Sequence, residues 1–378
     1  MNPKENLLAA LSHADPEWIP WVPYIGGVNT PAFVPEEIKR RQDFVEIGFF
    51  MQDELGCDIL ISGQAVRRGY QTAECHTARQ GDVVAETFEI AGRKLERVHR
   101  TFAYGDQETS VIFLYPVRTA ADMETLSWLF QDQDVGTGAQ DLQEKTKRLG
   151  ERGLAHANGP RTPIMALIIE YMGLEAFLFA LADHRSEMER LMETMHQANL
   201  AVCQSLAKTA CEVVGTFDDF DTSLISPALF SEYVLPSLKE YTDIYQQAGK
   251  LHMVHACGRI RAFLPLCLEV GYDAHNYVTP PPTGDTPLAE ARAIWGDGIT
   301  MMAAVDPVML EMAAPNQVSE RVHQMLEEVQ TERSFMLMTS SKPTVTEANL
   351  RAVAAVIRAQ GKRCSLGAGA TASERMDT

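Results

Sequence analysis

The feature that most constrains the fold is a repeated alternation of short apolar runs with longer segments of helical periodicity. Eight such runs occur along the chain, each bounded by polar or glycine-containing breaks. Short apolar runs of this kind suit strands that are buried on both faces, as in a parallel sheet. The eight expected strands are residues 18–24, 57–62, 154–158, 212–217, 250–255, 273–278, 300–305 and 334–340.

The segments between these runs are expected to be helices. Ser226 followed by Pro227 is a helix start, with serine as the N-cap and proline in the first helical position. Apolar residues then recur at helical spacing until Gly249, where the helix is expected to end. The other clear helical patterns are residues 183–207, 316–330 and 346–361.

Eight strands that alternate with helices over this length predict an α/β fold, a single (β/α)8 TIM barrel. Residues 81–105 alternate differently, as an antiparallel β-meander with a turn at Ala91-Gly92, and are expected to be an insertion in the N-terminal third. We assign residues 1–364 to the barrel and residues 365–378, which are small and polar, to a disordered tail. The alternative is an open doubly wound sheet, but no G-x-G-x-x-G sequence follows any expected strand.

The charge balance narrows the function. Lys and Arg number 33 against 51 for Asp and Glu, a formal net charge of −18. This charge repels phosphate backbones and anionic lipids, so neither a nucleic acid nor a membrane is an expected partner. The seven scattered cysteines do not resemble a disulfide framework, and the N-terminus lacks a basic-then-apolar leader. We therefore expect a cytoplasmic enzyme acting on a small molecule.

Chemically useful side chains follow the expected strands of the second half of the chain. In a barrel the carboxyl ends of the strands form one face, and that face holds the active site. The residues found there are Asp218, Asp219 and Asp221 after the fourth strand, His255 and Cys257 at the fifth, Asn276 and Tyr277 at the sixth, Asp306 at the seventh, and Thr339, Ser340 and Ser341 at the last.

His255 and Cys257 form the sharpest local pattern. On an extended segment residues i and i+2 point the same way, so an imidazole and a thiol could hold one metal ion. Mixed nitrogen and sulfur ligands favour zinc. The alternative is a buried thiol beside a hydrogen-bonded histidine. His252, three residues earlier, faces the opposite side of the strand and is expected to be structural.

The remaining polar positions have competing interpretations. Asp218 and Asp219 could act as a base, a metal ligand or a cation clamp, or could cap a helix or pair with an arginine. Asp306 before Pro307 favours a helix cap. Two pairs in the polar stretch after the second strand remain. Cys75-His76 is a less favoured candidate pair of metal ligands, because neighbouring side chains point apart in an extended chain. Arg67-Arg68 could bind an anionic substrate, but two solvent-exposed loop charges are the favoured interpretation.

The sequence resembles the uroporphyrinogen decarboxylase superfamily, and in particular its methylcobamide:coenzyme M methyltransferase branch. For the superfamily, the resemblance implies a barrel with its site at the strand carboxyl ends. For the branch, it implies zinc held by His255, Cys257 and a later cysteine, an acceptor thiol activated by the metal, and a corrinoid carried by a separate protein. The segments that carry the resemblance are residues 10–24, 224–227, 230–249, 252–260, 279–297 and 347–353.

Two departures from the family pattern bear on the function. The third zinc ligand should follow the last strand, where this chain has Thr339-Ser340-Ser341; Cys364 lies beyond the final helix. Decarboxylases of the superfamily carry arginine after the first strand to hold porphyrin carboxylates. The corresponding residues 25–33 contain none, which argues against porphyrinogen decarboxylation.

These observations give one preferred hypothesis and two alternatives. The preferred one is a corrinoid-dependent (cobalamin) methyltransferase with zinc on His255 and Cys257, and with Asp218 or Asp219 orienting the substrate. Further substrate contacts are expected from Asn276, Tyr277 and Ser340. The first alternative is a metal-free carboxy-lyase acting on a small or tetrapyrrole acid, and the second is a non-catalytic ligand-binding barrel. The sequence leaves the oligomeric state open, and a homodimer is one candidate assembly because barrel enzymes often form one.

Overall fold

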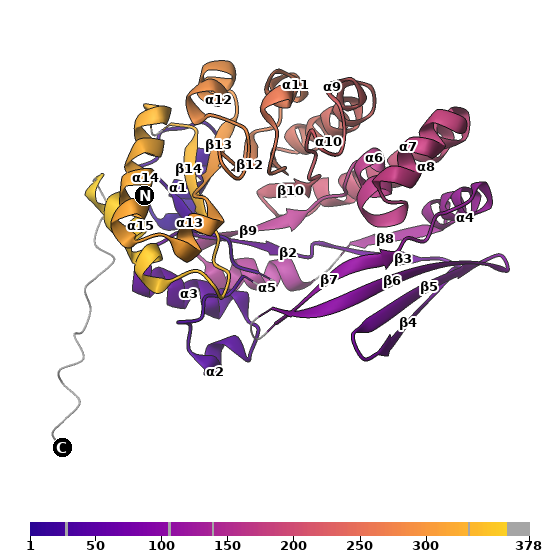
Figure 1. Ribbon diagram of the computed structural model, residues 1–378, viewed down its shortest axis with the longest axis horizontal. Helices are drawn as coiled ribbons and strands as arrows, with labels where there is room; N and C mark the ends of the chain where they lie inside the picture. Colours follow the sequence, from indigo (N-terminus) through magenta and orange to yellow (C-terminus); the bar gives the residue numbers. More distant parts are fainter. Residues whose placement is uncertain (27–28, 105–106, 138–139, 332, 361–378) are drawn as a thin grey trace.

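Eight parallel strands form the central sheet of the computed structural model, which describes residues 1–26, 29–104, 107–137, 140–331 and 333–360. The strand order is β1-β14-β13-β12-β11-β10-β9-β2, and the sheet curls into a barrel (Figure 1). All eight expected strands are confirmed, each within three residues of its expected ends. They are β1 (Trp21–Pro23), β2 (Ile59–Gly63), β9 (Gly153–Asn158), β10 (Val213–Phe217), β11 (Leu251–His255), β12 (Ala274–Val278), β13 (Thr300–Ala304) and β14 (Phe335–Thr339).

The barrel closes between β1 and β2 through a buried carboxylate. Asp58, which is 1% exposed, accepts a hydrogen bond from the Trp21 backbone N–H at 3.0 Å. The Asp58 backbone N–H in turn donates to the Trp21 carbonyl at 2.7 Å, and the Trp18 indole N–H lies 3.4 Å from the same carboxylate. The Asp58 carboxylate thus accepts the Trp21 N–H in place of a backbone carbonyl of β2.

Replacing Asp58 with alanine is expected to lower the free energy of unfolding by about 2 kcal/mol. The substitution leaves the Trp21 N–H buried without its charged acceptor, and such bonds contribute about 1.5–3 kcal/mol. Urea unfolding followed by far-UV circular dichroism measures the change. Asp183→Ala, at an exposed position, is the control and should stay within about 0.5 kcal/mol of the parent. Equal stability of both variants would show that Asp58 does not secure the closure.

Helices connect the strands and cover the outside of the barrel (Figure 1). Predicted caps are confirmed at Ser226 and Asp306, and Thr346, predicted as the start of the last helix, is also a cap; each of these side chains accepts a backbone N–H of the helix that follows it. The helices are α1 (Pro3–Leu11), α2 (Glu36–Lys39), α3 (Phe44–Leu55), α5 (Gln140–Leu149), α6 (Pro163–Ala166), α7 (Leu174–Asp183), α8 (Arg185–Ala207), α9 (Pro227–Leu229), α10 (Leu235–Gln247), α11 (Leu264–Val270), α12 (Leu288–Trp295), α13 (Pro307–Met312), α14 (Pro315–Val329) and α15 (Glu347–Ala359).

Two of the helical runs expected from the sequence differ in detail. The run after Ser226 is interrupted by a π-helical turn, Phe230–Val234, between α9 and α10. A second π-helical turn, Leu167–Tyr171, follows α6. The final helix ends at Ala359, and its expected end at Gly361 lies outside the described residues, as do Cys364 and the tail 365–378.

Two apolar cores hold the barrel together. The larger fills the space between the sheet and its surrounding helices. The smaller fills the barrel interior, where Met253, Met302 and Met336 meet Leu7 and Leu11 of α1. The first helix therefore contributes apolar side chains to the interior, which the sequence alone did not indicate.

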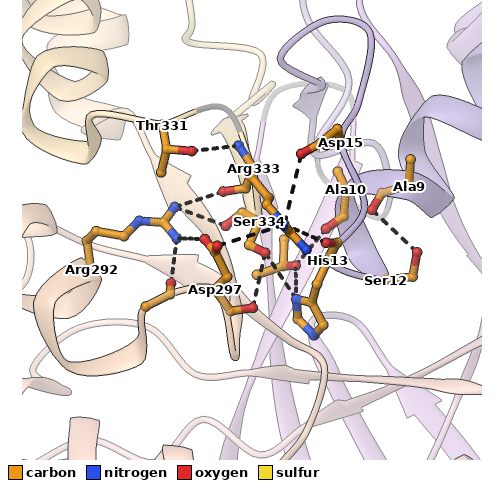
Figure 2. A network of polar contacts seen from close by, with 12 residues as sticks. Ala9, Ala10, Ser12, His13, Asp15, Arg292, Asp297, Thr331, Arg333 and Ser334 are labelled. Atoms are coloured by element: carbon orange, nitrogen blue, oxygen red, sulfur yellow. Dashed lines mark hydrogen bonds and ion pairs between the residues drawn. The ribbon is translucent and has the colours of Figure 1, made fainter.

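A polar network joins α1 to the first residues of β13 and β14 (Figure 2). The His13 ring lies 3.1 Å from Ser334 Oγ, and Thr300 Oγ1 donates to the Ala10 carbonyl at 2.7 Å. Arg292 donates to the Ser334 carbonyl, and Ser334 Oγ donates to the Asp297 carbonyl, both at 3.2 Å. These residues lie at the amino ends of the strands, the end of a barrel that serves stability rather than catalysis.

The insertion is larger than the sequence indicated. The expected turn at Ala91-Gly92 joins β5 to β6 as predicted, but residues 74–80, interpreted from sequence as a polar loop, form a further strand. Every side chain of that strand is exposed, so no apolar alternation marks it. The insertion contains β3 (Val66–Tyr70) paired with β8 (Gln133–Thr137), the sheet β4 (Glu74–Gln80), β5 (Val83–Ile90), β6 (Arg93–Tyr104) and β7 (Gln107–Leu114), and α4 (Ala120–Gln131).

The insertion follows the carboxyl end of β2 and returns to α5, so it leaves the barrel at the end where the strands terminate. Figure 1 shows its four-stranded sheet standing to one side of the barrel. Across the described residues, the helices are each too short or too polar to cross a membrane.

Candidate metal centre

Three neighbouring strands bring the candidate residues together. Phe217 at the end of β10 is in register with His255 at the end of β11, and His255 is in register with Asn276 of β12. Parallel pairing therefore fixes the imidazole between the two adjoining strand ends. The first residues beyond β10 and β11 extend the same edge, which places Asp219 and Cys257 beside His255.

The His255 ring is held from three sides. Its Nδ1 donates to Asn276 Oδ1 at 2.9 Å, and its Nε2 lies 3.3 Å from Asp219 Oδ1. The Phe217 ring stacks on it with centroids 5.2 Å apart. Because Nδ1 carries the proton shared with Asn276, the neutral imidazole presents the lone pair of Nε2, the tautomer that a metal ligand requires.

Asp219, His255 and Cys257 each offer one ligand atom, and these three atoms lie within 4.8 Å of one another. No second group of this kind occurs in the described part of the chain. Asp219 and His255 are half-buried and Cys257 is exposed, so one side of the group is open. A nitrogen, a sulfur and an oxygen donor with an open position suit a catalytic zinc ion.

Asp219 also binds Arg161, which in turn binds a second carboxylate. Arg161 Nη1 donates to Asp219 Oδ2 at 2.9 Å, and Arg161 Nε donates to Glu170 at 3.1 Å. Burial alone would raise the pKa of Asp219, but His255 and Arg161 lower it to about 2. Burial alone would lower the pKa of His255, but Asp219 and Cys257 raise it to about 10. At neutral pH the carboxylate is therefore ionised and the His255 ring is protonated, so a metal ion would bind Nε2 only with release of that proton.

The two carboxylates predicted as catalytic have different surroundings. Asp218 is fully buried and accepts hydrogen bonds from the Thr162 backbone N–H at 2.7 Å and from Thr162 Oγ1 at 2.9 Å. Burial raises the pKa of Asp218 to about 6. The Asp218 carboxylate thus binds the residue that precedes α6, whereas the Asp219 carboxylate is one of the three candidate metal ligands.

The predicted substrate-binding residues lie around the same edge. The Asn276 side chain holds His255, and the Tyr277 ring lies 5.8 Å from the His255 ring on backbone with a φ of +78°. Ser340 is 2% exposed at the end of β14. Among the other candidates, His252 is buried between Thr216 and Thr242, which confirms its structural role.

The less favoured candidates from the polar stretch after β2 are not part of the Asp219, His255 and Cys257 group. Cys75 and His76 are both exposed on β4 of the insertion, and the ligand group does not include them. Arg67 is exposed on β3 and pairs with Asp134 at 3.3 Å, in agreement with a solvated charge.

Sequence reasoning missed Arg161 and Glu170. Arg161 lies three residues beyond the end of β9, so reading past that strand as well would have found it. Glu170 lies in the π-helical turn Leu167–Tyr171, whose position no sequence pattern marked. π-Helical turns often occur at functional sites.

Comparison with known proteins bears on the family and the fold of this chain. The model of the uroporphyrinogen decarboxylase (URO-D) family matches residues 95–362. A uroporphyrinogen decarboxylase of Syntrophotalea carbinolica is 25% identical over 217 residues, which are 56% of this chain and 61% of that protein, less than two thirds of its length. A methyltransferase from Methanosarcina mazei superposes with a TM-score of 0.61 over 95% of this chain and 99% of that one; at 12% identity this likeness shows the fold.

Proposed function

This chain belongs to the uroporphyrinogen decarboxylase family, and we propose that within it the protein is a methyltransferase with a zinc ion on His255 and Cys257. The methyl group would pass between a corrinoid held by a separate protein and a small-molecule thiol. The observation that carries the proposal is the convergence of Nε2, Sγ and a carboxylate oxygen within 4.8 Å at the open end of the barrel.

The residues around the group suit this chemistry. A bound zinc ion holds a thiol as thiolate near neutral pH, and thiolate is the nucleophile in methyl transfer. Asn276 fixes the His255 tautomer, and Phe217 stacks on the same ring, so Nε2 is oriented before any ligand arrives. Cys257 is exposed and so within reach of a substrate.

A metal-free decarboxylation is the second candidate, supported by the family and by the Syntrophotalea carbinolica relative. It needs a cation to bind the substrate carboxylates. Arg161, which contacts the group through Asp219, already binds Glu170 and Asp219 at 3.1 and 2.9 Å. Because this arginine is neutralised by two carboxylates, we favour methyl transfer.

Methyl transfer can be tested with zinc-loaded protein, methylcobalamin and a panel of small thiols. The methyl group leaves Co(III) without its bonding electrons and joins the thiolate sulfur, so the products are a thioether and Co(I). We expect thiol-dependent loss of the methylcobalamin absorbance and a mass gain of one methylene in the thiol. Release of CO2 from a carboxylated substrate in the absence of corrinoid, with no methylated thiol, would instead establish the decarboxylase.

A further inference from the structure

We infer that Asp219 is the third protein ligand of the metal and that Arg161 is the positioning residue that aims its carboxylate. The inference rests on the metal centre of the proposed function but concerns this chain's own donor set. It moves the third ligand from the end of the last barrel strand, where the sequence suggested it, to the end of β10.

The first step is the disposition of the Asp219 carboxylate. Its two oxygens are divided between two partners, with Oδ2 2.9 Å from Arg161 Nη1 and Oδ1 3.3 Å from His255 Nε2. Oδ1 therefore faces the nitrogen that would bind the metal. An ion placed among Oδ1, Nε2 and Sγ would replace the direct contact between the carboxylate and the ring.

The second step concerns the end of β14. Thr339 Oγ1 accepts a hydrogen bond from the Trp21 indole N–H at 3.1 Å, and Ser341 Oγ donates to the Tyr24 carbonyl. Both hydroxyls therefore bind β1 and the residue that follows it. Ser340 Oγ accepts the Lys342 backbone N–H at 3.4 Å. This strand end holds the barrel together and offers no ligand of the usual zinc types.

The third step is that the backbone and Arg161 together restrict Asp219. The residue has a φ of +55°, a conformation that is unfavourable for a non-glycine residue and that clusters at functional sites. Its backbone N–H donates to the His255 carbonyl at 3.0 Å. Arg161 is itself fixed, because Glu170 holds its Nε and the Asp218 carbonyl accepts from its Nη1.

The charges of this arrangement also balance. A divalent cation with one thiolate and one carboxylate forms a neutral centre, and Arg161 is offset by Glu170. Three protein ligands leave the fourth tetrahedral position to the substrate, as in catalytic zinc sites. A neutral centre with an open position can accept an anionic thiolate without accumulating a large negative charge.

Cobalt(II) is the probe that tests the donor set, because its visible spectrum reports geometry and its near-ultraviolet band reports bound thiolate. Wild-type protein should bind one Co(II) with a tetrahedral spectrum. Asp219→Asn should weaken binding by about 100-fold. Asp219→Cys should retain tight binding and roughly double the thiolate-to-cobalt absorbance, since it supplies a second sulfur. Circular dichroism checks that each variant is folded.

Two further variants separate ligation from general disturbance of the loop. Asp221→Asn alters a nearby carboxylate that binds the Ser223 and Arg259 backbone N–H groups, and should leave cobalt affinity unchanged. Arg161→Gln should weaken binding by about 10-fold, and Arg161→Lys should restore part of the loss because it keeps the charge. A purely structural role for Arg161 would leave the cobalt spectrum unmoved.

The inference is overturned if Asp219→Asn binds Co(II) with wild-type affinity and spectrum, or if wild-type protein binds no Co(II). The methyl-transfer assay on the same preparations keeps the two proposals distinguishable. Cobalt binding that depends on Asp219, with no methyl transfer, overturns the proposed function and supports the ligand assignment. If methyl transfer occurs and cobalt binds equally well in the wild type and in Asp219→Asn, the proposed function is supported and the assignment of Asp219 as a ligand is overturned.

Discussion

Cys257→Ala is expected to reduce bound zinc from about one per chain to below about one tenth and to abolish detectable methyl transfer. The substitution removes the only soft donor of the Asp219, His255 and Cys257 group within the described residues. A nitrogen and an oxygen ligand alone hold zinc far more weakly than a set containing thiolate. Because Cys257 is exposed, its loss should change the free energy of unfolding by no more than about 0.5 kcal/mol when both proteins are unfolded in the presence of a chelator, which removes the contribution of zinc binding.

Metal content is measured by inductively coupled plasma mass spectrometry on untagged protein, beside the methyl-transfer assay. Cys75→Ala is the matched control, since Cys75 is also exposed but lies on β4 of the insertion. That variant should keep both zinc and activity. A Cys257→Ala protein that retains zinc and transfers methyl at the parental rate would remove the basis of the proposed function.

The barrel strands could be predicted because their burial on both faces leaves a plain trace in the sequence. Each appears as a short apolar run between breaks, and all eight are present. The strand of residues 74–80 could not be predicted in this way. Its side chains are all exposed and its pairing depends on β5, so neither alternation nor an apolar run marks it.

The candidate site was predictable in outline, because the barrel geometry directs polar residues at strand ends to one edge. The proximity of Asp219 to His255 and Cys257 fits that outline. The different surroundings of Asp218 and Asp219 could not be read from the sequence. One cause is the backbone of Asp219, which has a φ of +55°. The other is Thr162, which lies 56 residues before Asp218 in the chain and donates a hydrogen bond to the Asp218 carboxylate.

Acidification is expected to destabilise the fold strongly between pH 6.5 and pH 4, well before most carboxylates are protonated. Burial lowers the pKa of His156 to about 4 and those of His252 and His275 to about 3. Lys145 near His156 and His255 near His275 act in the same direction. These imidazoles stay neutral in the folded protein, whereas the unfolded chain binds protons below about pH 6.5.

The sign follows from proton uptake. Stability falls with falling pH wherever the unfolded state binds more protons, and at pH 5 each such histidine costs about 2 kcal/mol. Asp218 acts in the opposite direction, because its pKa is raised to about 6 and the folded state gains that proton first. This gain offsets about 1.4 kcal/mol at pH 5. His255, whose pKa is raised to about 10, also holds its proton more tightly in the folded state and offsets about 2 kcal/mol between pH 8 and pH 5, so the net loss relative to pH 8 is about 2.5 kcal/mol.

Urea unfolding at half-unit pH intervals measures the slope of stability against pH. His252→Gln replaces one buried imidazole with an amide that can still bind Thr216 and Thr242, and it should remove about one third of the histidine-dependent slope. His76→Gln, at an exposed position on β4, should leave the slope unchanged. A slope that is flat between pH 6.5 and pH 5, or equal in the two variants, would contradict this prediction. It would mean that the folded and unfolded proteins bind the same number of protons over this range, so the buried imidazoles would not be held neutral by the fold.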